Sequence, residues 1–150
     1  MKKFLCGLVA ATMLSCTGPD IELSGEAEHG IQRIIGDNTT ERVVCLYGEA
    51  QKGRYRVDSV ANGTVHSQRT SSRGACDETS SYLGSLHNHP SEACRFSDPD
   101  KASFYMDDDA QLGGVACQTD PLQVVWKTKP KDWYNTSHDT KEITTSYGTY

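Results

Sequence analysis

Two histidines two positions apart, His87 and His89, stand at the end of an apolar stretch and are followed by Pro90. Alternate residues of an extended strand point to the same side, so the two imidazoles are expected to share one face. Asp100 stands near the start of the next predicted helix and offers a third, hard ligand. Two imidazoles and a carboxylate, with water in the fourth place, are the donor set of a catalytic zinc site. We therefore predict that these three side chains bind Zn²⁺.

The spacing of these residues resembles the signature of the JAMM/MPN+ zinc metalloproteases (the JAB domain family), HxHP-x6-S-x2-D. The run from His87 to Pro90 reads HNHP, six residues separate it from Ser97, and two more precede Asp100. Every fixed position of the signature is therefore filled. In that family the two histidines and the aspartate bind zinc, and the serine helps to hold the tetrahedral intermediate. The resemblance implies the same roles here, with Ser97 as the oxyanion donor.

The resemblance also implies a glutamate upstream, in a motif close to E-x-x-G-x-L-x-G. Residues 41–48 read ERVVCLYG, which matches at Glu41, at Leu46 and at the final glycine. The run departs from the motif at Val44, where glycine is common in the family. Glu49 is the competing candidate, but it follows the glycine and lies off the pattern. Glu41 is therefore the preferred general base.

Hydrolysis of an amide or isopeptide bond is the reaction that the resemblance implies. Zinc lowers the pKa of a bound water to about 7, which makes a nucleophile available at neutral pH. Glu41 would take up the proton and pass it to the leaving amine, and the Ser97 hydroxyl would donate to the developing oxyanion. The alternative is a zinc-containing docking or scaffold module on the cell envelope that has lost turnover. A metallophosphoesterase or amidohydrolase is disfavoured, because such enzymes generally need a larger barrel than this chain can form.

The elements that position these residues are expected to be short strands and two helices. Strands are predicted at 41–48, 53–60, 81–86, 113–118 and 122–127, and helices at 24–35 and 97–108. Ser24 can cap the first helix, and Ser97 with Asp100 has the spacing of a capping box, which could be its whole role. The pattern predicts one α/β (α+β) domain. The resemblance implies the MPN/JAB type, a central mixed sheet flanked by helices with cytidine-deaminase-like layering.

The N-terminal segment has the features of a secretory signal peptide: two lysines, then an apolar run too short to span a bilayer. It ends in Met-Leu-Ser followed by Cys16, which resembles a bacterial lipobox and implies lipid on that cysteine. Ordinary cleavage near Ser15 is the alternative. The expected organisation is a signal peptide at 1–16, a flexible tether at 17–23, the metalloprotease-like domain at 24–130 and a polar, frayed tail at 131–150.

Four cysteines remain if Cys6 leaves with the signal peptide and Cys16 carries lipid. An even number in an exported chain favours two disulfides. Of the three possible pairings, we favour Cys76–Cys94 with Cys45–Cys117. The first pair flanks the histidine motif, and the second lies in strand-like runs.

Charge and export narrow the partners. The chain has 150 residues, a formal net charge of −5 and no basic cluster, which argues against nucleic acid. The expected location is the bacterial envelope, as a membrane-anchored lipoprotein or, alternatively, a soluble secreted or periplasmic protein. An envelope or cell-wall peptide is then the expected substrate, because an exported chain would rarely meet cytoplasmic protein tags.

Two further groups receive structural interpretations. The acidic run 107–109 lacks the ligand spacing of a calcium loop and is predicted to be a solvated helix end. Among the aromatic residues, Trp126 is expected in the core, and Tyr147 is expected in the polar tail.

Overall fold

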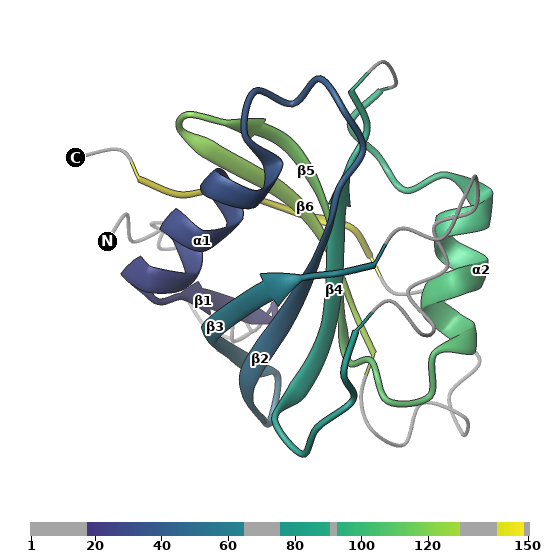
Figure 1. Ribbon diagram of the computed structural model, residues 1–150. Coiled ribbons are helices and arrows are strands. Elements are labelled where there is room, and N and C mark those ends of the chain that lie inside the picture. The colour runs from purple at the N-terminus through teal and green to yellow at the C-terminus, as the bar shows by residue number, and fades with distance from the viewer. Residues whose placement is uncertain (1–17, 65–75, 91–92, 130–140, 149–150) are drawn as a thin grey trace, which may run out of the picture.

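The computed structural model describes residues 18–64, 76–90, 93–129 and 141–148, which form one sheet and two helices (Figure 1). The strands are β1 (Asp20–Leu23), β2 (Val43–Gln51), β3 (Arg54–Asn62), β4 (Tyr82–Asn88), β5 (Leu112–Thr119), β6 (Leu122–Thr128) and β7 (Ile143–Ser146). The helices are α1 (Gly25–Ile35) and α2 (Asp98–Met106). Within the described residues, no helix has the length and apolar character needed to cross a membrane.

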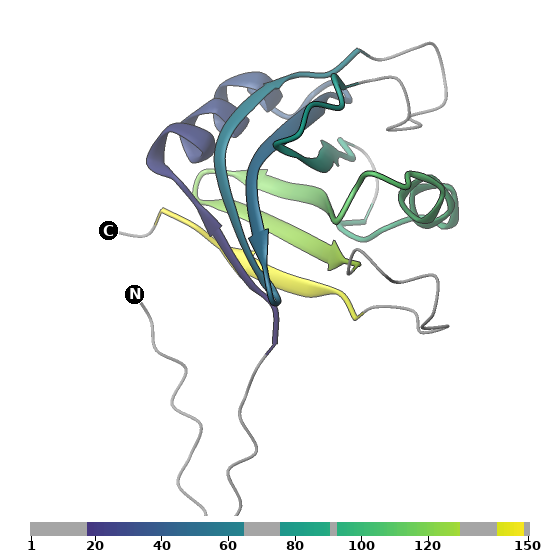
Figure 2. The same ribbon diagram turned by 90° about the horizontal axis from the view of Figure 1, so that it is seen from below.

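The seven strands form one curled, mixed sheet in the order β1-β3-β2-β4-β5-β6-β7. β1 pairs with β3 and β4 pairs with β5 in parallel, and the other neighbours are antiparallel. The helices lie on opposite sides of this sheet (Figures 1 and 2). A side chain added at Gly113 would meet Phe104 of α2, whereas one added at Gly114 would meet Trp126 in the core beneath α1. The predicted class, a mixed sheet flanked by helices, is confirmed.

α1 forms where the sequence predicts it. Ser24 caps its start, with the side-chain oxygen accepting a hydrogen bond from Ala27 N at 3.0 Å. Gly36 ends it with a φ of +63°, a conformation that glycine adopts without strain. The buried face of the helix, with Ile31 and Ile35, packs into the main core, which also contains Trp126 as predicted.

α2 begins with the predicted capping box. The Ser97 Oγ accepts from Asp100 N at 3.3 Å, and the Asp100 carboxylate accepts from Ser97 N at 2.8 Å. The helix ends at Met106, slightly before the predicted end. The buried ammonium group of Lys129 donates to the carbonyl oxygens of Phe104 and Asp107, so a cation satisfies the C-terminal carbonyls of α2. Both ends of this short helix are therefore fixed by specific side chains.

The predictions for the two flanking segments are wrong. The expected tether at 17–23 contains β1, which pairs in parallel with β3, and the expected frayed tail contains β7, which pairs with β6. The Tyr147 hydroxyl accepts from Trp126 Nε1 at 3.0 Å and donates to Ile21 O at 3.1 Å, so it joins the two edges of the curled sheet. The domain thus extends on both sides of 24–130. Short edge strands paired on one side carry little hydrophobic pattern, which explains why the sequence did not reveal them.

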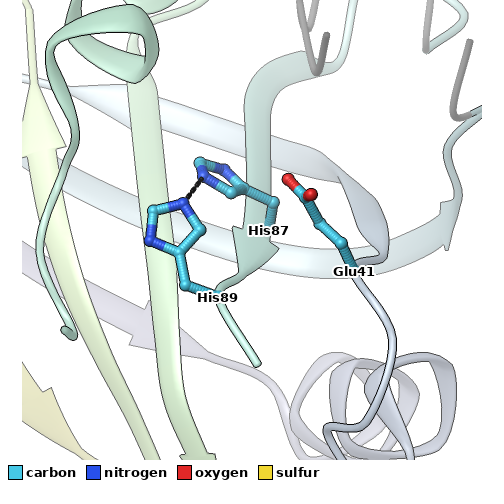
Figure 3. A group of neighbouring side chains, drawn as sticks. All are labelled: Glu41, His87 and His89. Carbon is cyan, nitrogen blue, oxygen red and sulfur yellow. Dashed lines mark hydrogen bonds between the residues drawn. The ribbon is translucent and has the colours of Figure 1, made fainter. Parts of the chain in front are cut away.

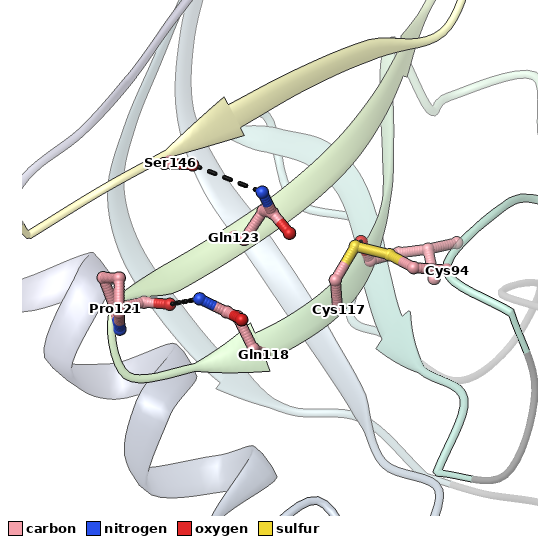
Figure 4. Close-up of a disulfide and its surroundings, with 7 residues drawn as sticks. Cys94, Cys117, Gln118, Pro121, Gln123 and Ser146 are labelled. Atoms are coloured by element: carbon pink, nitrogen blue, oxygen red, sulfur yellow. Dashed lines mark hydrogen bonds between the residues drawn. A yellow bond between two sulfur atoms is a disulfide. The ribbon is translucent and has the colours of Figure 1, made fainter.

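The predicted disulfide pairing is also wrong. One bond joins Cys45 to Cys76, with Cα atoms 5.6 Å apart. The other joins Cys94 to Cys117, with Cα atoms 5.1 Å apart (Figure 4). Cys45 lies on β2 and Cys117 on β5, and β4 runs between these strands. Two strand spacings amount to about 9.5 Å, beyond the reach of a disulfide. The strand order, which the sequence does not show, therefore decides the pairing.

Candidate metal centre

Strand β4 places the two histidines. It lies in the middle of the sheet, where His87 is paired with Val43 on β2 and with Val115 on β5. His89 follows directly after the strand, and both imidazoles lie on one face, with their Nε2 atoms 2.9 Å apart (Figure 3). Since β4 has neighbours on both sides, the backbone that holds the pair is fixed by the sheet itself.

The first turn of α2 brings Asp100 to this pair. Its two carboxylate oxygens lie 3.1 Å from His87 Nε2 and 3.1 Å from His89 Nε2, and the residue is only 7% exposed. Burial alone would raise the pKa of Asp100, but hydrogen bonds from His87 and Ser97 outweigh burial and hold the pKa at about 2. The capping box that starts the helix thus also orients a carboxylate toward the histidines.

The spacing of these donor atoms fits one small cation. Ligand atoms at 2.0–2.1 Å from a tetrahedral zinc lie about 3.3 Å from one another. The two imidazole nitrogens and the carboxylate oxygens are separated by 2.9 and 3.1 Å. The arrangement is therefore a metal-capable cluster of two imidazoles and one carboxylate.

The segment before β2 brings Glu41 to the same place. Its carboxylate and the ring nitrogens of His87 and His89 all lie within 4.8 Å of one another, and Glu41 points toward the pair (Figure 3). Continuing the register of β2 and β4 past Val43 sets Glu41 opposite His89. Glu49, the competing candidate, is paired with Arg56 near the other end of β2. The structure therefore places Glu41, and not Glu49, beside the histidines.

Ser97 touches the cluster through Asp100. Its side-chain oxygen accepts from Asp100 N, as the cap of α2 requires. A hydroxyl group has a donor as well as acceptor lone pairs, so capping leaves its hydrogen able to donate. A pocket beside the cluster, between the sheet and α2, is lined by His87 and Asp100 together with Val43, Ser85, Phe96, Ser103, Phe104, Ala110 and Gly114.

Asn88, between the two histidines, is a residue that the sequence analysis did not single out. It is fully buried and bonds to Asn38, Thr40 and Arg42, around Glu41. The position of Asn88 between the two histidines could have revealed it. Where two alternate residues of a strand share one face, the residue between them points to the other face.

A second group of carboxylates lies at the other end of α2. Glu78, Asp107 and Asp109 bring their oxygens within 4.8 Å of one another. Asp107 is 2% exposed and accepts from the Tyr82 hydroxyl at 3.0 Å and from Ala110 N at 3.2 Å. The prediction of a solvated helix end is thus wrong for Asp107, whose buried carboxylate fixes the turn that follows α2, whereas Asp108 and Asp109 are exposed.

Comparison with known proteins gives distant structural likenesses. The chain is similar to a JAB1/MPN domain protein from Archaeoglobus fulgidus, with 15% identity, a TM-score of 0.37 and coverage of 72% of this chain and 86% of that one. It is also similar to a structure described as JAMM, a metalloprotease-like zinc site in the proteasome and signalosome, with 16% identity, a TM-score of 0.40 and coverage of 85% and 94%. No known family profile and no curated protein matches the sequence.

Proposed function

We propose that this chain is a zinc-dependent hydrolase that cleaves an amide or isopeptide bond. The convergence of His87, His89 and Asp100 within 3.1 Å, with the Glu41 carboxylate beside them, is the observation that supports this proposal. His87 comes from β4, His89 from the residue directly after it, and Asp100 from α2, so the three ligands come from two separate regions of the chain. A bound zinc would supply a water of lowered pKa and would polarise a substrate carbonyl.

The remaining steps belong to residues of the chain. Glu41, exposed and next to the histidines, removes a proton from the attacking water and returns it to the leaving nitrogen. The Ser97 hydroxyl donates to the substrate oxygen that gains negative charge, a contribution of about 2.7–4 kcal/mol at comparable sites. The buried Asp100 stays ionised at neutral pH because its pKa is held at about 2, so its charge is available to a cation.

We place the substrate outside the cytoplasm. The two disulfides are typical of proteins in oxidising compartments. The predicted signal peptide and Cys16 lie outside the described residues, and export with lipid attachment stays a prediction that mass spectrometry of the mature N-terminus can check. An envelope or cell-wall peptide is the substrate class we propose.

The test is a paired substitution in protein loaded with one equivalent of zinc. Wild type and variants are screened against digested cell wall, peptide amides and isopeptide-linked substrates. Glu41→Gln should keep its zinc and lose activity by about 10²–10⁴-fold, the usual contribution of a general base. Glu49→Gln, near the far end of β2 and away from the histidines, is the matched control and should be fully active.

Two outcomes of this screen would argue against the proposed catalytic role. Full activity of Glu41→Gln on a cleaved substrate would sink the assignment of the base. Zinc bound by the wild type with silence across all substrates would instead favour a docking or scaffold module.

A further inference from the structure

Asn88 makes three hydrogen bonds with a side chain that is completely buried. Its Oδ1 accepts from Arg42 N at 2.7 Å, and its Nδ2 donates to Thr40 O at 2.9 Å and to Asn38 Oδ1 at 2.6 Å. The two N–H groups of the amide each have a partner, and the oxygen accepts one bond. All three partners belong to one short segment of the chain.

That segment carries Glu41. Thr40 and Arg42 are the residues immediately before and after it, so Asn88 holds the backbone on both sides of the glutamate. The segment lies between the end of α1 and the start of β2 and has no helix or strand of its own. Asn38 takes a φ of +60°, a left-handed conformation that asparagine tolerates well. The hydrogen bonds to Asn88 therefore supply an anchor that regular structure does not give here.

The position of Asn88 at the end of β4 links the Glu41 segment to the two histidines. His87 and His89 are its neighbours along the chain. The same short stretch of backbone therefore presents the two histidine ligands on one face and binds the Glu41 segment through the residue between them. Any shift of this end of β4 would move the two histidines and Glu41 together. A displacement of about 1 Å at a catalytic group can cost about 100-fold in rate, which makes such a coupling valuable.

We propose that Asn88 is a positioning residue that fixes Glu41 against the histidine pair. The catalytic consequence rests on the proposed function, but the hydrogen bonds from Asn88 to the Glu41 segment can be tested without any substrate. One arm of the test therefore measures the order of that segment, and the other measures catalysis.

The first arm measures backbone amide hydrogen exchange in zinc-loaded protein. The Arg42 amide, which precedes β2 but donates to Asn88, should exchange slowly in the wild type. In Asn88→Ala its exchange should accelerate at least tenfold, while the amides of Val44 and Leu46 in the strand keep their wild-type rates. Asn38→Gly suits the positive φ and removes one of the three bonds, so it should give a smaller acceleration, and it replaces Asn88→Ala if that variant does not fold.

The second arm is a double-mutant cycle on a substrate that the wild type cleaves. Asn88→Ala should retain one zinc per chain and lower kcat by about 10–100-fold at unchanged KM. In the Glu41→Gln background the same change should lower kcat no further, because Asn88 acts through Glu41.

Unchanged Arg42 exchange in Asn88→Ala and in Asn38→Gly would overturn the proposal. Additive losses in the cycle, or loss of zinc from folded Asn88→Ala, would also overturn it. If the wild type cleaves nothing, the proposed hydrolase fails, and the exchange arm alone still decides whether Asn88 holds the Glu41 segment.

Discussion

Asp100 lies in the first turn of α2 and Asp107 is the residue that ends this helix, and both carboxylates are buried. Their neighbours differ. Asp107 accepts from the Tyr82 hydroxyl and from backbone amides, groups that keep their protons near neutral pH. Asp100 faces two imidazoles, whose nitrogens can give up a proton and offer lone pairs to a cation. Both carboxylates are therefore buried and accept hydrogen bonds, and the imidazole neighbours of Asp100 are what distinguish a metal centre from a structural site.

The largest expected effect separates the two aspartates by zinc affinity. Asp100→Asn keeps an oxygen for the Ser97 amide but loses the anionic ligand. Its zinc affinity should fall by more than about 100-fold. Loss of a residue that only hydrogen-bonds to a metal ligand costs up to about 100-fold, and loss of a ligand itself should cost more. Asp107→Asn should bind zinc like the wild type and lose about 1–3 kcal/mol of unfolding free energy, as expected for a disturbed buried hydrogen bond. Isothermal titration calorimetry with zinc measures the affinities, and urea unfolding measures the stabilities. Equal zinc affinities of the two variants would contradict the distinction between Asp100 and Asp107.

The two disulfides extend the comparison to the segments around α2. Cys94–Cys117 ties the segment that leads into Ser97 to β5, whereas Cys45–Cys76 ties β2 to the segment before β4. Replacing either pair with serines should cost about 3 kcal/mol of unfolding free energy, since the closed loops are of similar length. Only loss of Cys94–Cys117 should also weaken zinc binding, because the segment that leads into α2 and Asp100 would no longer be tied to β5. A weaker zinc affinity only in the Cys45→Ser/Cys76→Ser variant would show that Cys45–Cys76, and not Cys94–Cys117, supports the zinc site.

The Asp100 end should respond to acid. In zinc-free protein its pKa of about 2 is below the ordinary 3.8, so the folded state binds this proton less readily than the unfolded state. The resulting stability is present above about pH 4 and is lost as the pH falls toward 2. Urea unfolding of the zinc-free protein from pH 5 to pH 2.5 should show a steeper loss in wild type than in Asp100→Asn. Parallel curves would show that the carboxylate is not held by His87 and Ser97.

The Asp107 end should respond to alkali, with the smallest effect. Burial, and then the nearby Asp107, raise the pKa of Tyr82 above its ordinary 10.0. Above pH 10 the unfolded state loses this proton and the folded state keeps it, so stability falls as the pH rises. Tyr82→Phe should flatten that fall between pH 9 and pH 11. Lys129, whose pKa burial lowers, is common to both proteins and cancels in the difference. An unchanged slope in the variant would contradict the role of Tyr82.

Local patterns in the sequence predicted much of this molecule. Ser24 and Ser97 marked both helix starts, and alternating or apolar runs marked the central strands, because capping and burial leave a record in neighbouring residues. The spacing of His87, His89 and Asp100 also anticipated side chains that the structure brings together. These features depend on contacts within a few residues or on a single strand and helix.

Non-local features could not be predicted in the same way. β1 and β7 were missed because each is short and half exposed and gains its order from a partner strand far away in the chain. The disulfide pairing depends on the position of β4 between β2 and β5. The role of Asn88 depends on a loop more than 40 residues upstream, as its bond to Arg42 shows.

The most direct test of the central claim is an anomalous-difference map, recorded at the zinc absorption edge from crystals of zinc-loaded protein. We predict one strong peak about 2.0–2.2 Å from His87 Nε2, His89 Nε2 and an Asp100 carboxylate oxygen. A peak at the cluster of Glu78, Asp107 and Asp109, or no peak at either end of α2, would contradict the assignment of the metal centre.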